Sequence, residues 1–286
     1  MNRSFRCCRH RVVPLCLLIL AGCSVLENLT PARKPSAHVT RARLDSIDLQ
    51  SATLQFDVAV ENPASVALPL VNVDYRLASG AASFLSGSAA LQGVVPAGSN
   101  RTVTLPARVV FADLLQLAKG IKPGSVVPYT LEAGLSVDPG IAGPIRLPAT
   151  WSGELPVPVP PTLELKEIRW DRLTLGEASG HLDLGLVNPN AFPFDLRSID
   201  YQLKLGGTQV AAASLAQAVS MGASGGTGSV RIPLSFSPTR LGLAVFRMLT
   251  GSQVNYDFSG NLAVSTPFGP MTLPVGKTGQ TASHGP

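Results

Sequence analysis

One stretch of the chain has the spacing of a catalytic motif, Gly222-Ala223-Ser224-Gly225-Gly226. The pattern Gly-x-Ser-x-Gly is that of a hydrolase nucleophile elbow, in which a serine on a strained strand-to-helix turn attacks an acyl group. That chemistry also needs a histidine later in the chain, and the one histidine after Ser224 is His284, near the end. The run leads into a predicted strand, not a helix. We therefore interpret it as a turn.

The other titratable residues do not form a catalytic or metal-binding set. His38 and His181 have no cysteine or second histidine at ligand spacing. Asp74 and Asp200 occupy equivalent places in two separate repeats, whereas an acid–base pair must converge in one cleft. The sequence therefore predicts no enzymatic activity, no metal site and no cofactor.

Cysteine chemistry is confined to the N-terminus. All four cysteines lie in the first 23 residues, and the last of them ends the run Leu20-Ala21-Gly22-Cys23. A basic start, a short apolar run and small residues before a cleavage point are typical of an export signal, here residues 1–22. The ending resembles the bacterial lipobox. That resemblance implies cleavage between Gly22 and Cys23, with a diacylglycerol thioether and N-acylation on Cys23. The alternative is an ordinary signal peptide that happens to end in cysteine.

The same resemblance predicts where in the cell the protein is located. Ser24 follows the cysteine, and in the family's sorting pattern a residue other than Asp there implies the outer membrane of a Gram-negative cell. The chain is then expected to face the periplasm. Residues 23–37 are expected to be the lipidated N-terminus and a tether. The expected partners are the membrane, through the lipid on Cys23, and envelope proteins or lipids.

The charge balance excludes a nucleic-acid surface. The net charge of +5 includes Arg3, Arg6, Arg9 and Arg11 of the export signal, which leaves 23 − 4 = 19 basic against 18 acidic residues. Nucleic-acid binding needs clustered Lys and Arg on the folded part, and no such cluster follows residue 43. Only 14% of the residues are charged, while 27 are Gly and 24 are Pro, which favours short strands joined by turns.

The body of the chain is a duplication. Asn62-Pro63 returns as Asn188-Pro189, and Tyr75 returns as Tyr201, each after 188 − 62 = 126 residues. A register kept over that distance indicates two copies of one domain. We expect domain 1 at 38–157, a Pro-rich linker at 158–161, domain 2 at 162–276 and a disordered tail at 277–286.

Hydrophobic periodicity assigns the elements within each copy. Apolar residues alternate with polar ones over 53–60 and 182–186, which predicts half-buried strands. Residues 111–120 and 237–249 have helical spacing, with Gly120 as a stop for the first and Ser237 as the N-cap of the second. The fold class is therefore mainly β: two tandem antiparallel β-sandwich domains, each with one α-helix.

Each copy resembles a late embryogenesis abundant type 2 (LEA type 2, or WHy) domain. The resemblance rests on Val-Asn-Pro-Asn at 187–190 and Ile-Asp-Tyr-Gln-Leu at 199–203, with weaker counterparts at 61–64 and 73–77, where Ala64 replaces the usual Asn. It implies a fibronectin- or immunoglobulin-like sandwich with one helix and a role in desiccation and stress protection. It brings no catalytic residue.

The sequence also predicts the positions of four aromatic residues in the fold. Tyr75 and Tyr201 follow the apolar phase of their strands, so we expect them in the core with hydroxyls bonded to the backbone. Trp151 and Trp170 flank the linker and are expected to pack at the domain junction. The leading functional hypothesis is a non-enzymatic, lipid-anchored protective or protein-interaction module. The alternative is a carrier or tether for an apolar or lipid ligand.

Overall fold

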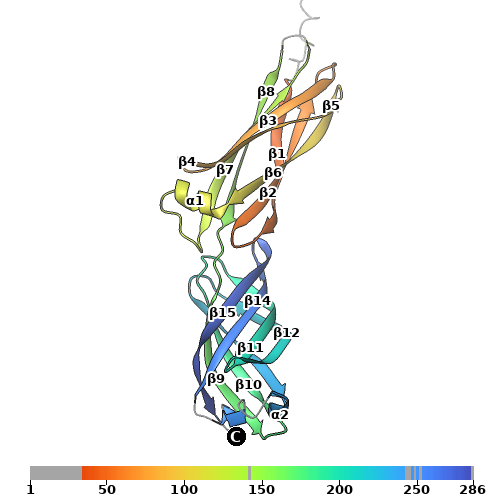
Figure 1. The fold of residues 1–286 in the computed structure, drawn as a ribbon. Coiled ribbons are helices and arrows are strands. Elements are labelled where there is room, and N and C mark those ends of the chain that lie inside the picture. The colour runs from red at the N-terminus through yellow and green to blue at the C-terminus, as the bar shows by residue number, and fades with distance from the viewer. Residues whose placement is uncertain (1–33, 141–142, 242–245, 248, 251–252, 285–286) are drawn as a thin grey trace, which may run out of the picture.

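The computed structural model describes residues 34–140, 143–241, 246–247, 249–250 and 253–284. They form two β-sandwich domains that lie end to end (Figure 1). The strands of the first copy make up one domain, and those of the second copy make up the other. The two tandem sandwiches predicted from the repeat are confirmed.

Domain 1 has two facing sheets. One sheet has the order β1-β2-β6, with β1 (Ser36–Ile47), β2 (Ser51–Asn62) and β6 (Ser99–Val110). The other has the order β4-β3-β7-β8, with β4 (Ala82–Ala90), β3 (Leu68–Ser79), β7 (Val126–Val137) and β8 (Ile145–Pro156), and the short β5 (Val94–Val95) pairs with β3. The helix α1 (Phe111–Leu117) follows β6. The pairing is antiparallel throughout, as hairpin connections require.

Domain 2 repeats this plan with one difference. Its strands are β9 (Thr162–Leu173), β10 (Ala178–Asn188), β11 (Phe194–Leu205), β12 (Thr208–Met221), β13 (Gly226–Phe236), β14 (Gln253–Thr266) and β15 (Gly269–His284). They form one continuous path, β12-β11-β14-β15-β9-β10-β13, because the end of β15 pairs in parallel with β9. In domain 1 the equivalent strands β8 and β1 belong to separate sheets.

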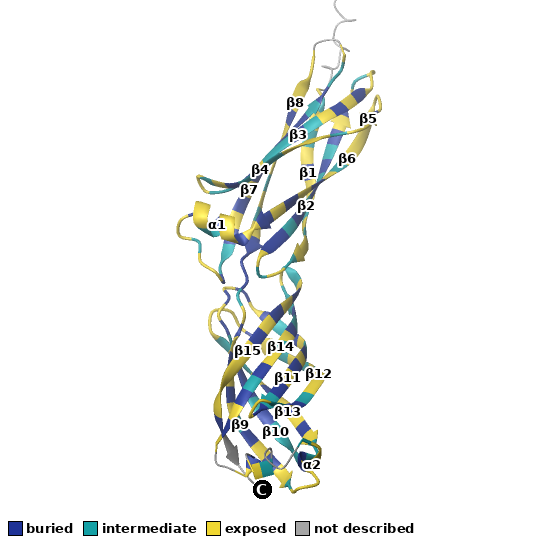
Figure 2. Cartoon of the chain, viewed as in Figure 1, coloured by how far each residue is buried: buried dark blue, intermediate teal, exposed yellow. Residues whose placement is uncertain are grey.

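Alternating side chains build both cores, as the period of two predicts (Figure 2). In β2 the residues Phe56, Val58 and Val60 are fully buried. In β10 the equivalent residues Leu184 and Leu186 are fully buried too. Each such side chain contributes about 1.5–3 kcal/mol by leaving water, so the sandwich is held by its apolar faces without any disulfide.

The helices follow the sequence pattern in part. The predicted helix at 111–120 is α1, which ends at Leu117; Gly120 follows with φ +97°, a left-handed conformation that suits glycine. In domain 2 the helix α2 (Pro238–Leu241) begins the predicted 237–249 segment, part of which lies outside the described residues. The Ser237 hydroxyl lies 3.1 Å from that of Thr239. No helix within the described ranges has the length and hydropathy to cross a membrane.

Two boundaries differ from those expected. The strand β1 begins at Ser36, inside the predicted tether at 23–37. The predicted disordered tail at 277–286 is wrong as far as His284, because residues 277–282 pair with β14 and the next two with β9. Strand pairing uses backbone groups, so a polar stretch without an apolar pattern can complete a sheet.

The two domains are joined by backbone hydrogen bonds as well as by the linker. Gly124, in the loop before β7, donates to the carbonyl of Val157 over 2.7 Å and accepts from Ala191 of domain 2 over 2.6 Å. Ile47 and Val126 of domain 1 pack against the core of domain 2. The junction is thus a packed interface between the two copies.

Candidate functional site

The Asn-Pro motif has a structural role in both copies. The buried Asn62 donates through Nδ2 to the carbonyls of Val66 (2.8 Å) and Val95 (3.0 Å), and its Oδ1 accepts from the amide of Ala64 (3.1 Å). Pro63 follows and cannot extend the ladder, because it has no N–H. The asparagine therefore replaces strand pairing with side-chain bonds where the chain leaves β2.

Domain 2 repeats these bonds and adds another residue to them. Asn188 Nδ2 donates to the carbonyls of Phe192 (2.8 Å) and Gly222 (2.9 Å), and Pro189 follows it. Asn190, which is also fully buried, donates to Asn188 Oδ1 through its amide (3.0 Å) and its carboxamide (2.9 Å). The hydrogen bonds of both asparagines thus close the turn after β10.

The two tyrosines of the repeat differ. Tyr201 is buried in the core and stacks on Phe258 with ring centroids 5.9 Å apart, whereas Tyr75 is half-buried. The expected hydroxyl bonds to the backbone are wrong for both, since neither hydroxyl bonds to any residue that the structure describes. Burial alone raises the pKa of Tyr201.

The serine motif is a turn, as predicted. Ser224 has φ +53° and Gly225 has φ +100°, and their amides donate to the carbonyls of Asn190 and Asn188, each over 2.7 Å. The turn thus docks on the Asn-Pro motif, and Ser224 is exposed without a histidine partner among the described residues.

The remaining polar candidates also lie apart. His38 is 3.9 Å from Glu61 in domain 1, and His181 is 4.0 Å from Asp171 in domain 2. Within the described ranges no three His, Cys, Asp or Glu side chains gather in a way that could hold a metal ion. Cys23 and the Gly22-Cys23 cleavage point lie outside the described residues.

The two tryptophans lie in different environments. Trp170 is not at the domain junction: it is buried in the core of domain 2, with its ring 5.8 Å from that of Phe236 in an edge-to-face contact. The prediction was wrong because Trp170 stands near the end of β9 that lies away from the linker. Trp151 of β8 does line a cavity to which domain 2 contributes Phe268.

That cavity is the best-formed candidate for an apolar ligand. It has a volume of about 270 Å³ and lies between the edge strands β1 and β8 of domain 1. Three aromatic side chains, Tyr129, Trp151 and Phe268, line it together with Leu44 and Leu54. In domain 2 the matching edges β9 and β15 are joined by backbone pairing, whereas in domain 1 they are not.

The buried side chain of Tyr129 forms part of the wall of this cavity. Burial raises the pKa of Tyr129 to about 12, against a smaller lowering effect from its hydrogen bond with Trp151. Arg43, Ser152 and Glu154 also line the cavity, so an aromatic wall stands beside polar and charged groups. Its volume is at the small end of the range of small-molecule pockets. The sequence did not predict Phe268 or Tyr129 here, because the first is 139 residues from the second (268 − 129 = 139) and no motif links them.

Comparison with known proteins decides the family. A model of the late embryogenesis abundant protein family (LEA_2) matches residues 57–153 and, separately, residues 183–279. The two matches correspond to the two copies and together span more than half of the chain. The chain belongs to the late embryogenesis abundant protein family. It carries two LEA_2 domains in tandem.

Individual relatives match one domain at a time. The chain is 30% identical over 134 residues to the desiccation protectant protein Lea14 homolog of Glycine max, which covers 47% of this chain and 88% of the relative. It is 30% identical over 135 residues to the desiccation-related protein PCC27-45 of Craterostigma plantagineum, which covers 47% and 89%. A solution structure of an Arabidopsis thaliana protein is 25% identical, covers 46% and 88%, and has a TM-score of 0.38. The fold assignment rests on the strand pairing described above, since that score is too low to bear on it.

Proposed function

We propose that this protein is a non-enzymatic, lipid-anchored envelope protein that protects other proteins when water is lost. The observation that carries the proposal is the match of both domains to a family whose similar members are named as desiccation protectants. The structure is compatible with it, since the polar motifs of the repeat are used to close turns. A fold stabilised by two apolar cores keeps its shape without a cofactor.

Drying tests the protective role directly. A dehydration-sensitive enzyme is dried and rehydrated with an equal mass of the chain from residue 24 onward, or of an unrelated β-sandwich protein. We expect more recovered activity with this protein than with the control sandwich. Equal recovery would remove the protective role and leave the family assignment in place.

The lipid anchor is a proposal that rests on the sequence around Cys23. A diacylglycerol thioether and an N-acyl chain would bury enough CH₂ groups for stable attachment, unlike a single chain. Ser24 supports the outer membrane as the address. We expect wild-type protein to take up labelled fatty acid and to fractionate with outer membranes, and Cys23→Ser to stay unlabelled and uncleaved. Equal labelling of the variant would exclude this anchor.

The junction cavity favours a second candidate function, the binding of an apolar ligand. Its aromatic lining suits an aliphatic chain or a small apolar molecule. Solvent extraction of the purified protein should then release a stoichiometric apolar compound. Ala42→Phe, which places a ring at the cavity wall, should release it, whereas the same change at Ala78, away from the cavity, should not. An empty extract from wild-type protein would count against this function.

A further inference from the structure

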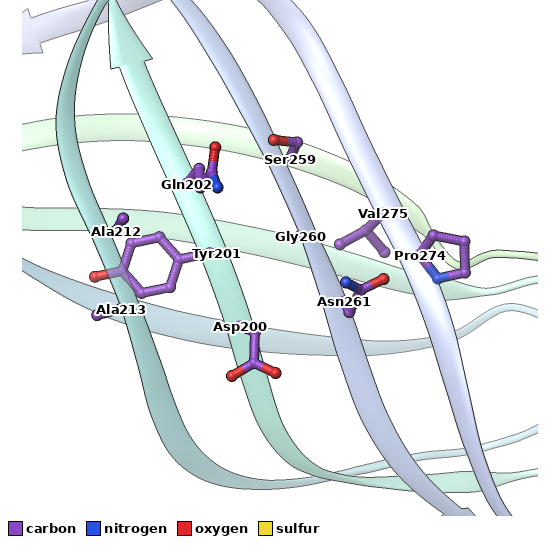
Figure 3. A pocket seen from close by; sticks show the side chains of 10 residues that line it. All are labelled: Asp200, Tyr201, Gln202, Ala212, Ala213, Ser259, Gly260, Asn261, Pro274 and Val275. Carbon is purple, nitrogen blue, oxygen red and sulfur yellow. The ribbon is translucent and has the colours of Figure 1, made fainter.

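The outer face of domain 2 carries an open depression of about 510 Å³, the largest of those described on this chain (Figure 3). Four polar side chains stand along it: Asp200 and Gln202 on β11, and Ser259 and Asn261 on β14. The other residues that line it are Tyr201, Ala212, Ala213, Gly260, Pro274 and Val275.

The strand register gives the four polar side chains a regular layout. Asp200 lies opposite Asn261, and Gln202 lies opposite Ser259. Residues directly opposite on paired strands are about 5 Å apart, and residues two apart on one strand are about 7 Å apart. The side chains therefore mark the corners of a rectangle with the size of a sugar ring.

Domain 1 has an equivalent depression of about 420 Å³, but the charged side chains that line it are paired with one another. Its four corners are Asp74, Arg76, Glu132 and Gly134, in the same register. Arg76 donates to Glu132 over 2.7 Å. Asp74 accepts from the guanidinium of Arg146, which also lies over Gly134 so closely that a Cβ there would collide with it.

Domain 2 does not have these ion pairs among its described residues. The position of Arg146 corresponds to Thr272 in β15 (272 − 146 = 126), which has no charge, and Gln202 and Ser259 replace the Arg76–Glu132 ion pair. All four corner side chains of domain 2 are exposed, and none bonds to another residue that the structure describes. They present one carboxylate, two carboxamides and one hydroxyl to solvent.

The chemistry of these groups selects the class of ligand. An apolar ligand would leave four polar groups unpaired, at a cost that exceeds the gain. In domain 1 the guanidinium of Arg146 lies over Gly134, which has no side chain. A guanidinium of a partner could not lie there in domain 2, because Asn261 occupies the equivalent position. An exposed ion pair would also contribute little to binding. A neutral molecule with several hydroxyls can donate to the carboxylate and exchange bonds with both carboxamides.

We propose that the depression of domain 2 binds a polyhydroxylated solute, a sugar or disaccharide, through Asp200, Gln202, Ser259 and Asn261. Its volume lies within the usual range for small-molecule sites. The depression is open, so binding is weak and becomes extensive when solutes are concentrated. The proposal is independent of the protective role, since the solute binds or does not bind in dilute solution whatever drying shows.

The test is an amide chemical-shift titration of the purified protein with sucrose, with glycine betaine as a matched solute that has no hydroxyl. We expect saturable shifts in β11 and β14 with sucrose and none with betaine. Asn261→Ala and Asp200→Ala should each weaken binding roughly 2- to 10-fold, as the loss of one hydrogen bond does. The equivalent change Asp74→Ala in domain 1 should leave it unchanged.

A variant in which a side chain fills the depression of domain 2 provides a second test of the proposal. Ala212 is exposed on the outer face, so Ala212→Phe blocks the site without entering the core, and an unchanged spectrum of the remaining residues would verify the fold. We expect the saturable shifts to disappear in this variant. Shifts that rise linearly with sucrose, or that persist in Ala212→Phe, would overturn the proposal.

Discussion

The carboxamide of Asn190 holds Val159 at both of its backbone groups. Oδ1 accepts from the Val159 amide over 2.9 Å, and Nδ2 donates to the Val159 carbonyl over 3.0 Å. Val159 belongs to the linker and Asn190 to the motif of domain 2. The linker is therefore bonded to the second domain as a strand would be, and Ala64, at the equivalent place in domain 1, has no group that could do this.

The first prediction concerns this bond. Asn190→Ala removes the partner of the Val159 amide, so we expect faster hydrogen exchange at Val159 and a loss of about 1–3 kcal/mol in the free energy of unfolding. Urea denaturation and amide exchange measure the two effects. The control is Asn255→Ala, an exposed position in β14. Unchanged protection of the Val159 amide would show that the linker is held by packing instead.

The second prediction concerns Gly180 in β10. A Cβ at this position would collide with the carbonyl of Arg169 and with Cα of Trp170, both backbone atoms that cannot rotate away. We expect Gly180→Ala to reduce the free energy of unfolding by about 1–3 kcal/mol, the usual cost of overpacking. Gly276→Ala is the matched control, because its nearest atom would be 3.6 Å away. Equal denaturation midpoints for the two variants would contradict the register of β9 on β10.

The third prediction concerns acid. Asp48 Oδ1 accepts from the amides of Gln50 and Ser51, each over 2.7 Å, and these bonds, the first above all, hold the pKa of the carboxyl below its usual value. A depressed pKa in the folded state stabilises the protein above the unfolded pKa of about 4, and this contribution is lost as the pH falls through the folded pKa.

The matching experiment compares stability at neutral and acid pH. We expect Asp48→Asn to be less stable than wild type at pH 7 and to approach it below about pH 4, because the side-chain oxygen can still accept but no longer carries charge. Asp45→Asn, at an exposed position of β1, serves as control. A difference that stays constant with pH would exclude the charged bond as its cause.

The fourth prediction concerns Tyr129 in the junction cavity. Because burial raises its pKa to about 12, the folded state keeps this proton well above the pH at which an exposed tyrosine loses its own. Folding stability from this group is present below the unfolded pKa of about 10 and is lost as the pH rises from there towards 12. A spectrophotometric titration should show a tyrosine that titrates near pH 12 and that is absent in Tyr129→Phe. An early, normal titration in wild type would mean that water enters the cavity.

Much of the fold could be predicted from local patterns. Three patterns can be recognised in the sequence alone: the alternation in β2 and β10, the Asn-Pro turns and the offset shared by Tyr75 and Tyr201. The first two involve only a few neighbouring residues, and the third repeats in register. They determined two tandem sandwiches and the family. The same locality explains the failure at the C-terminus, where β15 is a strand because β14 and β9 lie beside it.

The tertiary structure alone decided which residues meet. Trp151 and Trp170 lie a few residues before and after the same linker in the sequence. Trp170 nevertheless packs in the core of domain 2, whereas Trp151 lines the junction cavity together with Phe268. Asp74 and Asp200 have the same place in the repeat, yet only the first has an arginine beside it, supplied by another strand. The sequence by itself determined the architecture, because strand periodicity and turn chemistry are local. Contacts between segments that are distant in the sequence decide the cavities, the ion pairs and the hydrogen bonds of Asn190 to the linker. Strand pairing and core packing bring those segments together.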